Sequence, residues 1–158
     1  MKALLFFSTL LVLATGCSTN FAWKDPKIDL RQRKSYYVEP ELSDGRSLHK
    51  AIAEELRQLG YEADYGQITL MPKTADTLVS YQARWTWDFT TYLIELNIQV
   101  RDARTGRIIA SSDYHRPALK GTSTEEVIHH AVVSIFAPKS PTGTTAVKPT
   151  ASPSAPKP

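Results

Sequence analysis

Alternation of apolar and polar residues between Thr77 and Arg101 constrains the fold more than any other feature of this 158-residue chain. A period of two residues is that of a β-strand with one face on a core and the other in water. The residues between the two alternating runs, 88–91, predict the turn of an antiparallel hairpin. The apolar positions are Val79, Tyr81, Ala83, Trp85, Trp87 and Phe89 in the first run, and Tyr92, Ile94, Leu96, Ile98 and Val100 in the second.

Three more strands are predicted around this hairpin. Residues 35–39 predict a short strand that ends before Pro40, and residues 62–70 predict a weaker one. Gly106 lies in a polar turn after the hairpin and is free to adopt positive φ. Residues 107–115 then predict a return strand, so three consecutive antiparallel strands are expected.

Two amphipathic helices complete the domain, which we place at residues 34–137. The first begins after Ser43 or Asp44 as N-cap and ends at Gly60. The second begins after Thr122 or Ser123, each followed three residues later by Glu, as in a capping box. The predicted fold class is therefore α+β, in the order β-α-β-β-β-β-α, with an antiparallel sheet and both helices packed on one face.

The N-terminus predicts export. Residues 1–16 have a positive start and an apolar stretch far shorter than the roughly 20 residues that span a bilayer, as in a signal peptide. The last residues before and including Cys17, Ala14-Thr15-Gly16-Cys17, resemble the lipobox of bacterial lipoproteins. This resemblance implies cleavage before Cys17 and acylation of its sulfur and its new amine. Ser18 after the cysteine implies sorting to the outer membrane, with the domain in the periplasm.

The charge distribution argues against a nucleic-acid partner. The sequence pI is near 9.0, yet residues 34–137 contain 11 Lys and Arg against 14 Asp and Glu. The positive excess lies at the two ends: residues 17–33, predicted as a lipidated tether, and residues 138–158, predicted as a disordered tail rich in Pro, Ser, Thr and Lys. Such ends fit anionic lipid or cell-wall polymer better than a duplex, because a duplex reader needs a basic face on an ordered element.

No pattern predicts catalysis. The chain has no nucleotide-binding, metalloprotease or paired-cysteine motif, and its single cysteine allows no intrachain disulfide. His129 and His130 project about 100° apart on a helix, a poor geometry for one metal ion. Ser111, Asp113 and His115 are same-face neighbours on one strand, about 7 Å apart, and such triads normally draw on different elements. We therefore expect no enzyme activity, no metal and no cofactor.

The aromatic run of the hairpin is the candidate binding site. One hypothesis assigns these residues to the core, since aromatic side chains bury large areas. The other assigns the residues at the hairpin end to an exposed anchor for a protein partner or a glycan. The residues concerned are Tyr81, Trp85, Trp87, Phe89 and Tyr92.

Residues 35–136 resemble a widespread domain of unknown function found in outer-membrane lipoproteins of Gram-negative bacteria. The element order is also similar to that of lipoproteins that activate penicillin-binding proteins, and to the core of ring-forming lipoproteins of curli and exopolysaccharide export. The membrane-inserting hairpins of the curli type are absent. The residues that carry the resemblance are Leu59-Gly60-Tyr61, Ala75-Asp76-Thr77-Leu78-Val79-Ser80-Tyr81, Trp85-Thr86-Trp87-Asp88 and Asp102-Ala103-Arg104-Thr105-Gly106-Arg107-Ile108-Ile109-Ala110.

Two functional hypotheses follow. The first is a non-catalytic envelope lipoprotein, anchored through Cys17, that docks on an unknown envelope protein or cell-wall polymer through the face or edge of its sheet. The alternative is a homo-oligomeric ring or scaffold subunit in envelope polymer export. A monomer with protruding aromatic residues favours the first, and a discrete, concentration-dependent oligomer favours the second.

Overall fold

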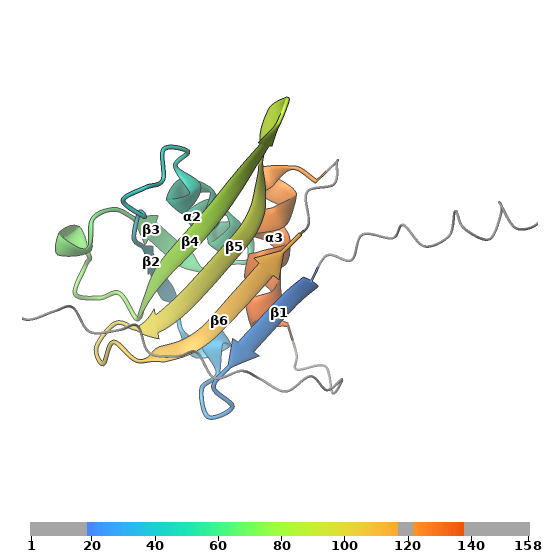
Figure 1. Ribbon diagram of the computed structural model, residues 1–158. Coiled ribbons are helices and arrows are strands. Elements are labelled where there is room, and N and C mark those ends of the chain that lie inside the picture. The colour runs from blue at the N-terminus through green and yellow to red at the C-terminus, as the bar shows by residue number, and fades with distance from the viewer. Residues whose placement is uncertain (1–18, 117–121, 138–158) are drawn as a thin grey trace, which may run out of the picture.

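Six strands form one sheet that carries two α-helices on a single face (Figure 1). The computed structural model describes residues 19–116 and 122–137; the predicted signal peptide, Cys17 and the predicted tail lie outside these residues. The strands are ordered β1-β6-β5-β4-β2-β3 across the sheet. The elements are β1 Thr19–Lys24, β2 Ser35–Val38, α2 Leu48–Gln58, β3 Glu62–Tyr65, β4 Thr77–Asp88, β5 Thr90–Asp102, β6 Ile108–His115 and α3 Thr124–Phe136, with short 3₁₀ turns η2 at Leu30–Gln32 and η3 at Ile68–Leu70.

The predicted α+β class is confirmed, with both helices on one face of the sheet. Helix α3 lies against β1, β5 and β6, and α2 lies against β2 and β3. The His129 imidazole on α3 meets the Glu55 carboxylate on α2, with Nδ1 2.7 Å from Oε1, which ties the two helices together. The core between the layers includes Val38, Ile52, Val79, Leu96, Ile98, Ile109, Val127, Ile128 and Ile135, each at most 2% exposed.

The sheet is mixed, which corrects the prediction of a purely antiparallel one. Strand β2 pairs in parallel with both β3 and β4, whereas β4, β5, β6 and β1 pair antiparallel. Parallel neighbours need a crossover connection, and α2 supplies it between β2 and β3. The strand-helix-strand order of residues 35–65 was the available signal for this arrangement.

The predicted tether, residues 17–33, is also corrected, because it contains strand β1. Thr19 to Lys24 pair antiparallel with His115 to Ala110 at the edge of the sheet. The Lys24 ammonium donates to the carbonyl of Ala137 at 2.7 Å, which holds β1 against the end of α3. Six polar-rich residues carry little strand signal of their own, so the pairing with β6 decides their conformation.

Strand β3 is shorter than predicted. The sequence suggested a strand over residues 62–70, but pairing stops at Tyr65 and the chain enters a 3₁₀ turn after Gly66. Gly66 has φ of 152° and lies under the Tyr37 hydroxyl, where an added Cβ would be 2.5 Å from the oxygen. Only glycine fits this backbone conformation next to the tyrosine.

Three of the four helix ends follow the predicted signals, but the predicted N-cap of the first helix, Ser43 or Asp44, is wrong. The Asp44 carboxylate accepts from the Leu48 amide at 2.6 Å, although Ser47, with φ of 58°, occupies the N-cap position itself. Gly60, with φ of 90°, closes α2, and the Tyr61 amide donates to the carbonyl of Leu56. At α3, Ser123 is the N-cap, since its Oγ accepts from the Glu126 amide at 3.1 Å.

The motifs behind the family resemblance have structural roles. The Asp76 carboxylate accepts from the amides of Lys34 and Ser35 and so joins the start of β4 to the start of β2. The Asp102 carboxylate accepts from the Thr105 amide and hydroxyl and pairs with Arg33 at 2.8 Å. Both carboxylates organise turns, which fits motifs that identify an architecture rather than an activity.

Candidate functional site

The base of the β4–β5 hairpin is tied into the core through Tyr81. Its ring is 4% exposed, and its hydroxyl donates to Asp44 at 2.5 Å and accepts from the His49 amide at 3.2 Å. Burial, followed by the hydrogen bond to Asp44, raises the pKa of Tyr81. Burial alone would raise the pKa of Asp44, but hydrogen bonds from the Tyr81 hydroxyl and from backbone amides outweigh it and hold that pKa below its usual value.

A β-bulge separates this base from the outer part of the hairpin. Arg84 pairs with Glu95, but the next residue, Trp85, pairs with Leu93, so Ile94 is the extra residue. Leu93 is 5% exposed and joins the core, whereas Ile94 is only half-buried. The predicted alternation, in which Ile94 shares a face with Leu96, therefore fails at this point, because a bulge shifts the faces of the strand by one residue.

Trp85 and Tyr92 lie on the boundary between core and solvent. Both are half-buried, and Trp85 packs on the core. The guanidinium of Arg46 lies over the Trp85 ring, with Cζ 4.5 Å from the ring centroid. This cation–π contact covers the outer side of the indole and marks the limit of the packed part of the hairpin.

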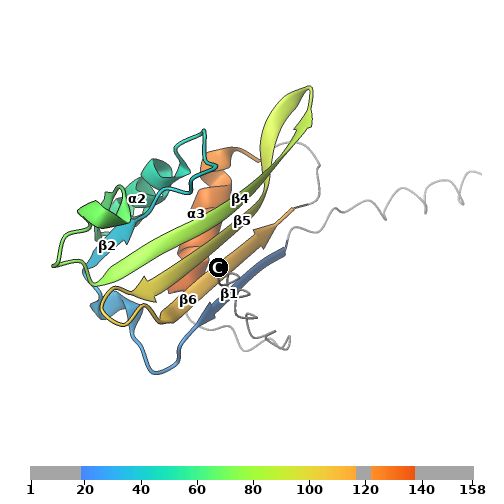
Figure 2. The ribbon, with the colours of Figure 1, turned by 60° about the vertical axis from the view of Figure 1, so that its left-hand side comes forward.

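Trp87 and Phe89 form the exposed tip. Trp87 is 70% exposed and Phe89 90% exposed, and their ring centroids are 6.0 Å apart. The tip extends beyond both helices, as the two ribbon views show (Figures 1 and 2). Phe89 has φ of 57°, a left-handed backbone conformation that a bulky residue adopts only at a cost.

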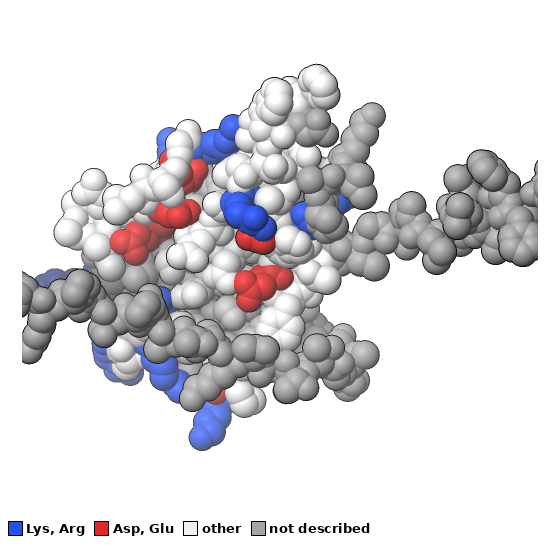
Figure 3. Space-filling view, in the orientation of Figure 1, with Lys and Arg blue, Asp and Glu red and all other residues white. Residues whose placement is uncertain are grey.

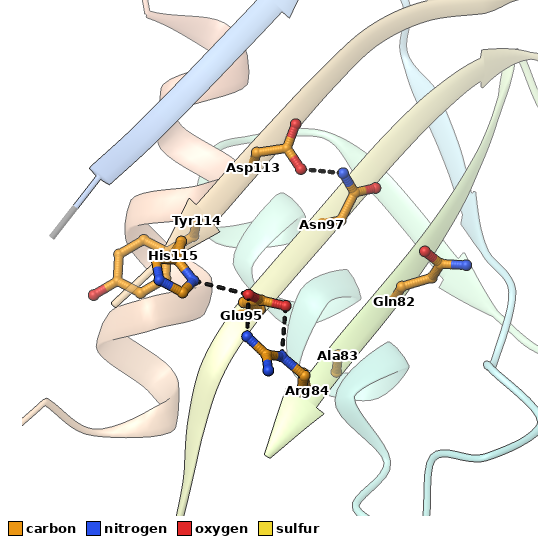
Figure 4. Close-up of a pocket in the computed structure, with 8 residues that line it drawn as sticks. All are labelled: Gln82, Ala83, Arg84, Glu95, Asn97, Asp113, Tyr114 and His115. Atoms are coloured by element: carbon orange, nitrogen blue, oxygen red, sulfur yellow. Dashed lines mark hydrogen bonds and ion pairs between the residues drawn. The ribbon is translucent and has the colours of Figure 1, made fainter. Parts of the chain in front are cut away.

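The face of the sheet away from the helices carries both acidic and basic side chains among uncharged ones (Figure 3). A shallow hollow of about 440 Å³ lies on it, across β4, β5 and β6. Its charged and amide side chains, apart from Gln82, are paired with one another (Figure 4). The residues that line it are Gln82, Ala83, Arg84, Glu95, Asn97, Asp113, Tyr114 and His115.

Glu95 is the centre of this pairing. Its carboxylate accepts two hydrogen bonds from the Arg84 guanidinium, one of them from Nε at 2.7 Å, and lies 2.9 Å from Nδ1 of His115. The Arg84 hydrogen bond holds the pKa of Glu95 below its usual range. His115 is thus bound to Glu95, and Asp113 accepts from Asn97. The Ser111, Asp113 and His115 side chains therefore form no relay in this geometry.

Neither a metal cluster nor a membrane-spanning helix occurs in residues 19–116 and 122–137. No group of three or more His, Cys, Asp or Glu side chains in this part of the chain is placed to hold a metal ion. None of the helices described there combines the length and apolar character needed to cross a bilayer.

The structure divides the predicted site. Of its five aromatic residues, Tyr81 belongs to the core, Trp85 and Tyr92 lie at the boundary, and Trp87 and Phe89 are exposed. The core assignment therefore holds for Tyr81, whereas Trp87 and Phe89 are exposed, and a binding role for them stays a prediction. The predicted lipidation site, Cys17, lies outside the described residues. Sequence reasoning missed the aromatic residues of β1, Phe21 and Trp23, which face the open side of the sheet; their spacing of two residues was the only signal.

Comparison with known proteins identifies the fold. No protein-family model matches the chain, and no curated protein sequence matches it. Two crystal structures of the PelC dodecamer from Paraburkholderia phytofirmans, one of them a single-substitution variant, match with a TM-score of 0.54 and 15% sequence identity. The match covers 75% of this chain in both cases, and 96% and 94% of the two PelC chains. The chain therefore shares the fold of a PelC subunit over nearly the whole length of that subunit.

Proposed function

We propose that this protein is a non-catalytic assembly subunit of the bacterial cell envelope, anchored to the periplasmic face of the outer membrane through Cys17, that works as a homo-oligomer. The observation that carries the proposal is the fold shared with PelC, which was crystallised as a dodecamer. This shifts the balance between the two hypotheses from docking on a different protein toward a ring or scaffold in polymer export.

The edges of the sheet support self-assembly. In the described part of the chain, β1 and β3 are the terminal strands, and no strand pairs with their outer edges. An unpaired edge presents backbone donors and acceptors that a second copy can use. Because β1 and β3 differ, joining one to the other would be a heterologous contact, the type that closes into rings.

The chemistry of the open face supports a non-catalytic role. Glu95 is neutralised by Arg84 and approached by His115, and Asp113 is held by Asn97. A general acid or base needs a carboxyl group free to meet a substrate. These mutually paired groups also supply most of the polar lining of the hollow.

The test is the mass of the mature, acylated protein in detergent, measured by analytical ultracentrifugation over a range of concentrations. A single discrete oligomer larger than a dimer is the expected result. A monomer at every concentration would contradict the proposal and favour docking on a different envelope protein. The Cys17→Ser protein is the control, because it separates assembly of the domain from association through shared detergent micelles.

The anchor has its own test. Trypsin cleavage after Lys24 releases the peptide that begins at Cys17, whose mass reports the acyl groups directly. We expect the mass of a triacylated peptide from the wild-type protein. An unmodified cysteine would remove the anchor from the proposal and leave the assembly test unaffected.

A further inference from the structure

The exposed tip of the hairpin has no partner in the described structure. Trp87 and Phe89 are two of the largest apolar side chains in the chain, and both are mostly exposed. They lie in contact distance of each other rather than scattered. An exposed aromatic pair on a projecting element is typical of a contact surface.

The backbone conformation at Phe89 is strained and reduces the stability of the hairpin turn. Phe89 occupies a left-handed conformation with φ of 57°, where Gly or Asn is the ordinary choice in a hairpin turn. A strained, bulky residue at such a place persists at functional sites when its side chain is needed there. The turn thus carries an aromatic side chain at a position where Gly or Asn would give a more stable hairpin.

The register of the sheet places this tip at the same end of the sheet as Thr19, the first described residue. Thr19 pairs with His115, His115 with Glu95, and Glu95 with Arg84. These four residues form one row across the sheet. Beyond this row, β4 and β5 continue to the tip, and from Thr19 the chain leads in two residues to Cys17.

The hairpin tip extends farther from this row than Cys17 can. Two residues from Thr19 to Cys17 span at most about 7 Å. Five residues from Arg84 to Phe89 extend about 16 Å along the strands. If Cys17 lies at the boundary between headgroups and acyl chains, the tip reaches at least about 9 Å beyond it, near the inner limit of the roughly 5–10 Å at which interfacial apolar groups lie.

The composition of the tip suits the headgroup region of a bilayer. From Trp85 to Tyr92 the sequence holds four aromatic residues and three threonines, and Asp88 is its only charged residue. Trp and Tyr concentrate at membrane interfaces, whereas a carboxylate is costly in the hydrocarbon core and limits the depth.

A basic side chain lies next to the tip, at the level where headgroup phosphates would lie. The Arg46 guanidinium lies over the Trp85 ring, with Cζ 4.5 Å from the ring centroid. In Figure 3, blue side chains appear below the white outer hairpin, with red ones beside them. Basic groups behind an aromatic tip favour an anionic membrane surface.

We propose that Trp87 and Phe89 insert into the interface of the same lipid bilayer that holds the acylated Cys17, so that the hairpin tip is a second, protein-made membrane contact. The inference rests on the lipid anchor of the proposed function and goes beyond it. Two separate contacts restrict the tilt of the sheet against the membrane, which a single lipid anchor does not do.

The test uses the mature, acylated protein in vesicles of phosphatidylethanolamine and phosphatidylglycerol that contain brominated lipid, which quenches nearby tryptophan. The chain has three tryptophans, Trp23, Trp85 and Trp87. We expect a blue-shifted, quenched emission in which most of the quenching disappears in Trp87→Phe and remains in Trp23→Phe. The Phe89→Ser variant, which keeps all three tryptophans, should show weaker quenching of Trp87.

The outcomes distinguish failure of the membrane contact at Trp87 and Phe89 from failure of the lipid anchor at Cys17. Protein that floats with the vesicles but shows no quenching assigned to Trp87 overturns the inference and leaves the anchor in place. Protein that does not float overturns both. Loss of the discrete oligomer in detergent in a Trp87→Ser protein would assign the tip to a second copy of the chain and also overturn the inference.

Discussion

The two ends of the β4–β5 hairpin have similar sequences and opposite environments. At the base, Tyr81 is buried against α2 and its hydroxyl binds the Asp44 carboxylate. At the tip, Trp87 and Phe89 continue the same aromatic pattern but extend beyond both helices into solvent (Figure 2). Aromatic residues in one strand therefore stabilise the fold only as far as a second layer covers them, and beyond that point they are available for contacts.

The largest expected difference between the two ends comes from core truncation. Leu96→Ala removes a side chain that is 0% exposed beneath the helices, and we expect a loss of about 2–5 kcal/mol in the free energy of unfolding. Trp87→Ala at the tip removes a larger side chain, yet we expect a change within about 0.5 kcal/mol. Urea unfolding of both variants measures the difference. Similar losses would show that the tip packs on the domain.

The next prediction concerns the polar anchor of the base. Tyr81→Phe deletes the hydroxyl that binds Asp44, and we expect a loss of about 1.5–3 kcal/mol because the acceptor is charged and mostly buried. Urea unfolding at neutral pH measures this loss. Trp85→Phe, which removes no buried hydroxyl group, is the matched aromatic control and should lose less.

The pH dependence of the stability difference between wild type and Tyr81→Phe tests this second prediction further. The folded-state pKa of Asp44 is lowered, so its stabilising contribution is complete above the unfolded value of about 3.9 and is lost as the pH falls through the lower folded value. The gap between wild type and Tyr81→Phe should therefore narrow below pH of about 4. A gap that stays constant from neutral pH to this range would mean that the Asp44 charge does not contribute.

The base was largely predictable from the sequence, and the tip was not. Alternation identified both strands and their turn, and the helical spacing identified the layer that covers them. Period alone does not reveal where the covering layer ends, because Trp87 follows the same alternation as Tyr81. The bulge at Ile94 was equally hidden, since Leu93, Ile94 and Leu96 are all apolar and either register of the strand satisfies the pattern.

The missed strand β1 has a different cause. Its six residues alternate weakly, with Phe21 and Trp23 on one face, and its conformation depends on β6, nearly 90 residues later in the sequence. Parallel pairing of β2 with β4 was hidden for a similar reason, because it depends on which end of the sheet the chain returns to after η3. Local pattern specifies elements well, but the order of strands follows from long-range packing.

The third prediction tests the strain at the tip. Phe89→Gly relieves a left-handed backbone conformation, and we expect an increase of about 0.5–1 kcal/mol in the free energy of unfolding. Thr91→Gly, on the neighbouring strand, is the matched control and should lose about 0.5–1 kcal/mol, because glycine weakens a strand interior. Thermal unfolding measures both. A destabilised Phe89→Gly protein would mean that the Phe89 ring packs on the fold.

The smallest effect is expected on the open face, where Glu95→Gln weakens the pair with Arg84. The Arg84 hydrogen bond lowers the folded-state pKa of Glu95, so this contribution is present above the unfolded value of about 4.3 and is lost as the pH falls through the folded value. The Arg84 and Glu95 side chains are 59% and 39% exposed, so water and salt screen the pair and we expect less than about 1 kcal/mol. Unfolding in low salt and in about 1 M salt, where the screening length is near 3 Å, should show the effect disappear. The loss of unfolding free energy in Tyr81→Phe should persist in the same salt, because the partially buried Asp44 contact is screened less. An equally salt-sensitive loss in Tyr81→Phe would contradict the contrast between the covered base of the hairpin and the open face.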